Sequence, residues 1–339
     1  MTIKAKTGSH SRILSVGSYR PKRLVMNSEI VDRIESNDEW IQQRTGIQSR
    51  RFADESESVV DMACWAAESA LKRAGITIAD VDTVIVATIT FPHQAPSAAT
   101  AIIARLGNPA AAAFDIGAAC AGFSYAVSMA HDFVFAGTSK KVLVIGVEKI
   151  SDFTNPDDRA TAFIFADGAG AVVIGASDTP GIGPVVWGSD AENRDAITMD
   201  PPWTAMRSAT QKSVGDIDWP NISQEGQKVF RWAVFSMSKA ALKALESAGL
   251  TVNDIDAFIP HQANVRIIET MAKEMDMPDS VVIADDIRTN GNTSAASIPL
   301  AMDALLAKHP ELHGKIALLI GYGAGLVYAG QVVKLPPKP

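Results

Sequence analysis

Two stretches of the chain resemble each other at a fixed distance along the sequence. Residues 71–87 read LKRAGITIADVDTVIVA, and residues 245–261, which begin 174 positions later, read LESAGLTVNDIDAFIPH. The same offset relates KVLVIG at 141–146 to KIALLI at 315–320. Because two separate segments share one offset, we infer an internal duplication into two similar halves, residues 1–180 and 181–339.

Each copy shows the same order of local signals. In the first, SVVDMACWAAESALKRAG has helical spacing, with Ser58 as a start signal and Gly75 as a stop signal. The apolar run VDTVIVAT follows, which is typical of a strand buried on both faces. This alternation predicts a layered α/β fold of mixed sheets covered by helices. Residues 176–225 lack periodicity and are predicted to hold the crossover between the halves and a long surface excursion.

Composition narrows the classes of protein further. The 339 residues are 47% hydrophobic and 20% charged, with a net charge of −7, which argues against a general surface for nucleic acid or anionic membranes. Two cysteines cannot form a disulfide framework, which indicates a reducing compartment. The N-terminal residues contain no apolar segment of signal-peptide length, and the apolar stretch around Cys120 is too short to span a bilayer. We therefore expect a soluble cytoplasmic protein with no nucleic-acid and no membrane partner.

The first candidate for chemistry is Cys120, in IGAACAGF. A strand pattern precedes this cysteine and a helical pattern follows it, so its sulfur is predicted near a helix N-terminus, where the dipole and free N–H groups favour a thiolate. Small neighbours permit a tight turn and close approach of a substrate. A buried structural thiol is the alternative. Cys64 lies inside a helical pattern and is predicted to belong to the core.

Two polar residues of the second half occupy related places. His261 follows a strand that ends at Ile259–Pro260, and a helix is predicted from about Gln262. Asn292 follows an Asn-Gly turn, where it could simply cap the start of a helix. For His261, the corresponding alternative is a hydrogen-bonded packing role. At the offset of 174, His261 corresponds to Ala87, and Cys120 corresponds to Ser294, beside Asn292. We therefore expect these side chains to face one shared crevice.

Two glycine-rich segments resemble nucleotide loops but lack the full patterns. ADGAGA at 166–171 and GYGAG at 321–325 match neither GxGxxG nor GxxxxGK[ST]. GYGAG ends an apolar strand, and we interpret it as closely packed backbone whose N–H groups can donate to a bound oxyanion. No His, Cys and Asp cluster has the spacing of a metal site, so no metal is expected.

Taken together and in this order, AACAGF, PHQAN and GNTSAAS resemble the three active-site motifs of β-ketoacyl-[acyl-carrier-protein] synthase III, a family of the thiolase superfamily. The resemblance runs from DEWIQQRTGI, through DRATAFIFADGAGA, to GYGAG. It implies a thiolase-like duplicated five-layer αβαβα fold and a homodimer. The N-terminal half would carry the nucleophile Cys120, and the C-terminal half would carry His261 and Asn292.

The resemblance also implies a reaction. An acyl group from acyl-CoA would be joined to malonyl-[acyl-carrier protein], with release of CO₂ and CoA, to start fatty acid biosynthesis. Cys120 would take the acyl group as a thioester. His261 and Asn292 would hold the malonyl thioester carbonyl, and the backbone N–H groups of Cys120 and Ala324 would form the oxyanion hole. Many relatives carry glycine in place of Ala324. No metal or redox cofactor is implied.

By the same resemblance, CoA would contact Trp40, Arg44, Arg159 and Asn264. Adenine would stack between Trp40 and Arg159, and Asn264 would lie near the pantetheine arm. A packing role for Trp40, in a helix capped by Ser36 with Glu39 completing a capping box, is the alternative.

Acyl carrier protein is acidic, so the resemblance assigns its docking to a basic patch of Arg266, Lys273 and Arg231, weakened by Glu274. Ala95 falls where the family closes the acyl pocket across the dimer interface. Its small size predicts primers longer or more branched than acetyl.

Three rival interpretations remain. A type III polyketide synthase-like enzyme also uses Cys, His and Asn, although the sequences PHQAN, GNTSAAS and DEWIQQRTG favour the fatty-acid enzyme. Thiolases use a second active-site cysteine, for which Cys64 is the remaining candidate. A catalytically inactive partner subunit that only shapes a pocket is the non-enzymatic alternative, and the retention of all three polar residues argues against it.

Overall fold

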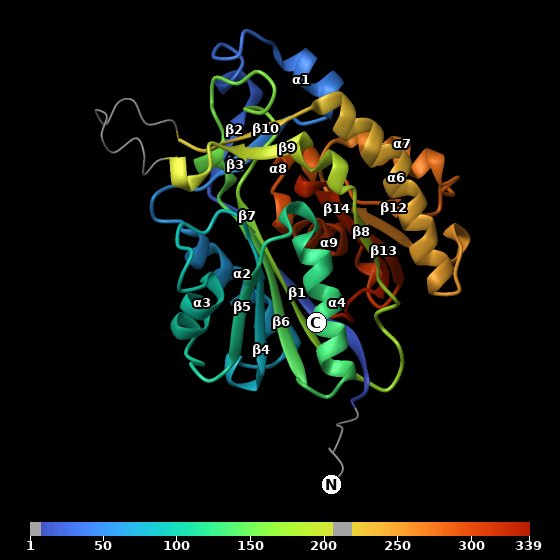
Figure 1. Ribbon diagram of the computed structural model, residues 1–339. Helices are drawn as coiled ribbons and strands as arrows, with labels where there is room; N and C mark the ends of the chain where they lie inside the picture. The colour runs from blue at the N-terminus through green and yellow to red at the C-terminus, as the bar shows by residue number, and fades with distance from the viewer. Residues whose placement is uncertain (1–7, 206–218) are drawn as a thin grey trace.

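The computed structural model describes residues 8–205 and 219–339 (Figure 1). Within these residues, one five-stranded sheet has the order β1-β7-β6-β4-β5 and a second has the order β8-β14-β13-β11-β12. The first comprises β1 (His10–Tyr19), β4 (Thr83–Ala87), β5 (Ala112–Ile116), β6 (Lys141–Glu148) and β7 (Gly168–Ser177). The second comprises β8 (Val186–Ser189), β11 (Ala257–Pro260), β12 (Val282–Ile283), β13 (Ile316–Gly323) and β14 (Val327–Lys334).

The two sheets share one topology. In each, the two strands at the β1 or β8 end run antiparallel to their neighbours, and the remaining pairs are parallel. This correspondence confirms the internal duplication. The division at 180/181 stays a prediction, and it falls in the connection between β7 and β8.

Helices form three layers around the two sheets, and Figure 1 shows α2 and α3 on one flank and α6 and α7 on the other. The layers comprise α2 (Val59–Ala74) and α3 (Ala98–Leu106), α4 (Gly122–Phe135) and α9 (Ser297–Lys308), and α6 (Gly226–Ser247) and α7 (Val265–Glu274). Ile85 packs with α4 and α9 between the sheets, whereas Val84 and Val86 pack with α2 and α3 outside. The order of layers is therefore αβαβα, as predicted.

The offset between the halves is not uniform. Thr83 pairs with Val142 in the first sheet, and the equivalent Ala257 pairs with Ala317 in the second. The offset is thus 174 at β4 and 175 at β6. It is also 175 at the 3₁₀ turns before α4 and α9, residues 119–121 and 294–296. The structural counterpart of Cys120 is therefore Ala295, and the predicted match to Ser294 was wrong by one residue.

Local signals predict the ends of α2 correctly and the start of α1 incorrectly. Ser58 caps the start of α2 and Gly75 ends it in the left-handed conformation, as predicted. At α1 the N-cap is Asn37, whose side chain accepts from the N–H of Trp40, so the assignment to Ser36 was wrong. Both residue types suit this position, and the sequence does not decide between neighbours.

Short elements cover the carboxyl ends of the central strands at the top of Figure 1. They are β2 (Arg23–Met26), α1 (Asp38–Thr45), β3 (Ser49–Phe52), β9 (Ile197–Asp200), β10 (Asn221–Gln224) and α8 (Ile287–Asn290). The excursion predicted in 176–225 contains β8, β9 and β10, and its residues 206–218 lie outside the described part. In the described part, none of the helices combines the length and apolar character needed to cross a membrane.

Candidate active site

A cavity of about 580 Å³ opens between the two halves, where parallel strands of both sheets end. It brings together every predicted catalytic and CoA-binding side chain. The predicted residues that line it are Trp40, Arg44, Cys120, Arg159, Arg231, His261, Asn264, Arg266, Asn292 and Ala324. Lys273 and Ala95 are not in its lining.

Cys120 sits in a tight turn between β5 and α4. Ala119 has φ +43°, a strained conformation for a residue with a side chain, which marks a constrained site. The backbone of Gly323 approaches so closely that a Cβ there would lie 2.9 Å from the cysteine sulfur. Glycine at this position therefore lets the 321–325 segment pack against the thiol.

The environment of Cys120 opposes ionisation. Desolvation raises the pKa of Cys120 to about 11 and outweighs the hydrogen bonds from its own N–H and the Ala324 N–H, which lower it. The N–H groups at the helix N-terminus thus favour the thiolate, but desolvation has the larger effect on the pKa. Both N–H groups predicted for the oxyanion hole do point to the sulfur.

The ring of His261 is held as a hydrogen-bond donor. Its Nδ1 lies 2.7 Å from the hydroxyl oxygen of Ser297, and that oxygen also accepts from the N–H of Gln262 at 3.3 Å. Ser297 is 1% exposed, and among the described residues Nδ1 is the one acceptor that its hydroxyl hydrogen has. Nδ1 therefore accepts and Nε2 carries the proton. Burial lowers the pKa of His261 to about 3, so the ring is neutral near pH 7.

Asn292 is fixed in a matching way. Its Oδ1 accepts from the N–H of Ser294 at 2.9 Å, which leaves its NH₂ group as the free donor. Its backbone N–H donates to the carbonyl of Ile164, and its carbonyl accepts from Ala166, both at 2.9 Å. Residues 164–166 of the first half thus hold Asn292, a catalytic candidate of the second half, in position. The cap-like bond predicted for this side chain exists, but α9 itself begins five residues later.

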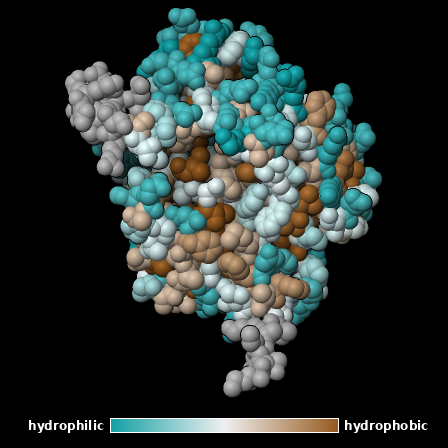
Figure 2. Space-filling model, in the orientation of Figure 1, coloured by the Kyte–Doolittle hydropathy of each residue, from teal (hydrophilic) through white to brown (hydrophobic). Residues whose placement is uncertain are grey.

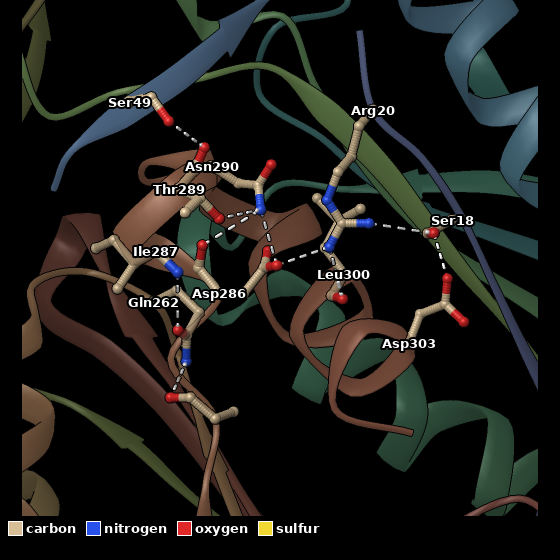
Figure 3. A network of polar contacts seen from close by, with 11 residues as sticks. Ser18, Arg20, Ser49, Gln262, Asp286, Ile287, Thr289, Asn290, Leu300 and Asp303 are labelled. Atoms are coloured by element: carbon tan, nitrogen blue, oxygen red, sulfur yellow. Dashed lines mark hydrogen bonds and ion pairs between the residues drawn. The ribbon is translucent and has the colours of Figure 1, made fainter. Parts of the chain in front are cut away.

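A polar network behind the cavity braces the segment that leads to Asn292 (Figure 3). Arg20, just after β1, pairs with Asp286 at 2.8 Å, and Asn290 donates to the same carboxylate at 2.9 Å. Gln262 donates to the carbonyl of Pro260 at 2.8 Å and accepts from the N–H of Ile287. The network ties both halves to the turns that carry His261 and Asn292.

Glu148, at the end of β6, was not identified from the sequence. Its carboxylate is fully buried and accepts hydrogen bonds from Thr88, Thr90 and Ser294 side chains and from the N–H of Ile89. Desolvation outweighs these bonds and raises the pKa of Glu148 to about 7. The available signal was a lone acid that ends the otherwise apolar run KVLVIGVE.

The predicted CoA-binding residues form an aromatic and cationic group. The guanidinium carbons of Arg44 and Arg159 lie 4.9 and 5.1 Å from the centre of the Trp40 ring. Phe163 contacts the same ring edge-on at 5.4 Å. Asn264 caps α7 and donates to the carbonyl of Arg44 at 3.1 Å, so its side chain joins α7 to α1 at the rim of the cavity.

The predicted carrier-binding residues lie on α6 and α7. Arg231, Arg266 and Lys273 are all exposed. The first two line the cavity, and Arg266 lies over the Phe230 ring at 5.6 Å. Lys273 lies two turns farther along α7, outside the cavity.

Two further residues lie apart from the cavity of this chain. Ala95 is exposed in the loop between β4 and α3. Cys64 is buried in α2, where desolvation raises its pKa to about 11, which accords with a core residue. In residues 8–205 and 219–339, no group of three or more His, Cys, Asp and Glu side chains is arranged to hold a metal.

Comparison with known proteins identifies the family. Descriptions of 3-oxoacyl-[acyl-carrier-protein] synthase III and of its C-terminal part match residues 114–191 and 245–335. A β-ketoacyl-[acyl-carrier-protein] synthase III of Streptomyces glaucescens is 52% identical over 332 residues, which cover 98% of each chain. A mycobacterial synthase III of Mycobacterium avium is 50% identical over 99% of each chain.

Solved structures agree. The priming β-ketosynthase of the R1128 polyketide pathway superposes with a TM-score of 0.96 at 44% identity, covering 100% of both chains. The synthase III of Aquifex aeolicus superposes with a TM-score of 0.86 at 35% identity, covering 96% of this chain and 99% of the other. The chain therefore belongs to the β-ketoacyl-[acyl-carrier-protein] synthase III family of acyltransferases.

Proposed function

We propose that the chain joins an acyl-CoA primer to malonyl-[acyl-carrier protein] with loss of CO₂, through a thioester on Cys120. The observation that carries this proposal is the convergence, in one cavity, of a thiol with two neutral donors, His261 and Asn292. The names of the relatives support the reaction and its place at the start of fatty acid biosynthesis.

Acylation comes first. The thiolate of Cys120 attacks the acyl-CoA carbonyl, and the N–H groups of Cys120 and Ala324 stabilise the oxyanion that forms. A backbone donor serves equally well from alanine or glycine. Transfer to Cys120 then frees CoA and divides a three-component reaction into two steps.

Decarboxylation follows in the same cavity. Loss of CO₂ from the malonyl group leaves an enolate, which the Nε2–H of His261 and the NH₂ of Asn292 stabilise. Both donors are oriented before substrate arrives, by Ser297 and by the Ser294 N–H. The enolate carbon attacks the acyl-cysteine and regenerates the thiolate.

Recognition uses the rim of the cavity. Trp40 and Arg159 supply a ring and a planar cation that suit an adenine base, and Arg44 and Asn264 extend the CoA surface. Arg231, Arg266 and Lys273 present positive charge to the acidic carrier protein beside the entrance, on a chain whose net charge is negative. The substrates are thioesters, and the proposed chemistry requires no metal or redox cofactor.

A homodimer completes the proposal. β5 ends its sheet, and Phe114 and Ile116 on this edge strand are half-buried beside Met129 and Phe133 of α4. Hydrophobic residues also gather across the middle of the face shown in Figure 2. The family resemblance implies that Ala95 of a second copy closes the acyl end of the cavity, where alanine leaves space for longer or branched primers. We place the dimer in the cytoplasm.

One of the similar solved structures supports a second candidate pathway. The R1128 enzyme, 44% identical, primes polyketide synthesis, so the same condensation here could serve a polyketide carrier. A type III polyketide synthase-like activity draws no support from the names of the relatives described above. An inactive pocket-shaping subunit is the remaining alternative, and activity assays address it directly.

The test measures 3-oxoacyl-carrier formation and CO₂ release from acyl-CoA and malonyl-carrier protein. His261→Ala and Asn292→Ala should each lower condensation by ~10²–10³-fold, the cost of one oxyanion donor, while still permitting acylation of Cys120. Parallel assays with fatty-acid and polyketide carrier proteins separate the two pathways. Unchanged condensation in both variants would overturn the assignment.

A further inference from the structure

Glu148 is a buried carboxylate without a cationic partner among the described residues. Its Oε2 accepts from the hydroxyls of Thr90 at 2.7 Å and Thr88 at 3.2 Å and from the N–H of Ile89 at 3.1 Å. Its Oε1 accepts from Ser294 at 3.2 Å. Burying an ionised carboxylate with hydrogen bonds alone is costly, so a role for this group is expected.

The carboxylate is connected to the nucleophile through Ser294. The hydroxyl hydrogen of Ser294 is donated to Glu148 at 3.2 Å, which leaves the hydroxyl oxygen to accept from the thiol of Cys120 beside it. Ser294 has φ +49°, and its N–H is bonded to Asn292, so the backbone holds this hydroxyl in place. The chain of contacts is thiol, hydroxyl and carboxylate, in that order.

His261 cannot be the group that accepts the thiol proton of Cys120. In the tautomer assigned above, the lone pair of Nδ1 accepts from Ser297 and Nε2 carries the proton, so neither nitrogen is free to take the proton of a thiol. The thiol of Cys120 is also protonated near pH 7, because burial keeps its pKa high. Acylation therefore requires a proton acceptor other than the ring.

We propose that Glu148 accepts the thiol proton of Cys120 through Ser294 during acylation and returns it after condensation. This inference rests on the proposed function of Cys120 as the nucleophile. The thiol S–H bond breaks as its proton moves to the Ser294 oxygen, and the Ser294 proton moves to Oε1 of Glu148. The sulfur forms its bond to the acyl carbon as the carbon–sulfur bond to CoA breaks.

The protons balance over the full cycle. CoA leaves as a thiolate and takes one proton from solvent, and this is the one proton that the overall reaction consumes. Loss of CO₂ consumes none, because the enolate that remains forms a carbon–carbon bond. The enolate carbon bonds to the acyl carbon and displaces the thiolate of Cys120. The proton held on Glu148 then returns through Ser294 to that sulfur, and the resting state is restored.

Electrostatics favours this sequence. The negative charge of Glu148 raises the pKa of Cys120, so protonation of Glu148 removes a repulsion as the thiolate forms. It also leaves the acyl-enzyme without that buried charge when the malonyl carboxylate enters. The groups that face the carboxylate are the three hydroxyls, the Ile89 N–H and the titratable thiol of Cys120, while the neighbouring Lys149 ammonium bonds the carbonyl of Asp54.

The test is the rate of acylation by acyl-CoA alone, followed by rapid quench and intact mass between pH 5.5 and 9.5. In the unaltered protein, the rate should rise with pH through an inflection near 7, where Glu148 loses its proton. Glu148→Gln should lower the rate at pH 8 by about 10²-fold, the usual scale of general-base help, and abolish that inflection. Ser294→Ala should give a similar loss, and the double variant should show little further loss.

A matched pair at Thr90 tests the same carboxylate without removing it. Thr90→Val deletes the shortest hydrogen bond to Glu148 and should move the inflection to higher pH, whereas Thr90→Ser keeps the hydroxyl and should not. This pair tests the relay independently of the Glu148→Gln variant.

The outcomes separate the two proposals. Normal rates and an unchanged pH profile in Glu148→Gln and Ser294→Ala, or identical profiles for the Thr90 pair, would overturn the relay and leave the proposed function standing. Absence of acylation in the unaltered protein would overturn the proposed function and the relay together.

Discussion

The hydroxyl of Ser297 lies 2.7 Å from Nδ1 of His261 and fixes which ring nitrogen carries the proton. The two residues are 36 positions apart and meet because β11 ends where α9 begins. The structure therefore presents a neutral imidazole as a donor to the cavity.

Ser297→Ala should weaken condensation while sparing the first half-reaction. Without the serine hydroxyl, the ring can place its proton on either nitrogen, and only one tautomer donates to the enolate. We expect a loss of at least about tenfold in malonyl decarboxylation, but less than the ~10²–10³-fold that follows removal of a complete donor. The measurement compares decarboxylation with acylation of Cys120, and equal losses in both would indicate a merely structural role.

Glu148→Gln should stabilise the fold while slowing acylation. Burial raises the pKa of Glu148 from 4.5 to about 7, so the folded state favours the protonated form. Its carboxylate therefore costs stability increasingly as pH rises from 4.5 to 7, and fully above that range. The gain in unfolding free energy should reach up to about 3 kcal/mol at pH 8 and vanish near pH 4. Thermal unfolding at both pH values checks this, and a lower midpoint at pH 8 would refute it.

Arg266→Glu should impair use of malonyl-carrier protein more than use of acyl-CoA. Because Arg266 also lines the cavity, Lys273→Glu is the cleaner variant, since it changes charge on α7 outside the cavity. Both should raise the KM for the carrier, and added salt should weaken carrier binding by the unaltered protein, because exposed charges are screened. The measurement is a pair of KM values for each variant, and equal effects on both substrates would place these cations elsewhere.

Ala95→Phe should shift primer preference toward acetyl-CoA. A phenyl ring at the acyl end of the partner's cavity would remove space for methylene groups, each worth about 0.8 kcal/mol when buried. Acylation rates across a ladder of straight and branched acyl-CoAs give the measurement, with malonyl decarboxylation as the control. A ladder that does not change, or a strong preference for acetyl-CoA in the unaltered protein, would show that Ala95 is not the gate.

Much of this arrangement was predictable because the informative residues stand at strand ends or turns. Cys120 and His261 each follow an apolar strand, Asn292 follows an Asn-Gly turn, and a duplicated fold places the corresponding segments of the two halves together. The internal repeat by itself therefore indicates a crevice shared by the two halves. The mixed sheets and the helix 59–74 followed from periodicity alone.

What escaped prediction depends on contacts between distant segments. Glu148 and Ser294 are 146 positions apart in the sequence, and no local sequence pattern predicts the hydrogen bond between them. The high pKa of Cys120 was not predicted, because the helix terminus is visible in the sequence, whereas desolvation appears only once both halves enclose the sulfur. The one-residue change of offset likewise depends on strand register, which the pairing of β6 and β13 sets.

The most direct test of the account is the mass of the protein after incubation with acyl-CoA alone, followed by mapping of the modified peptide. We expect one acyl group on Cys120, its loss in Cys120→Ser, because a serine hydroxyl ionises far less readily than a thiol and is a weaker nucleophile, and its retention in Cys64→Ser. An acyl group on Cys64, or near-normal condensation by Cys120→Ser, would contradict the account.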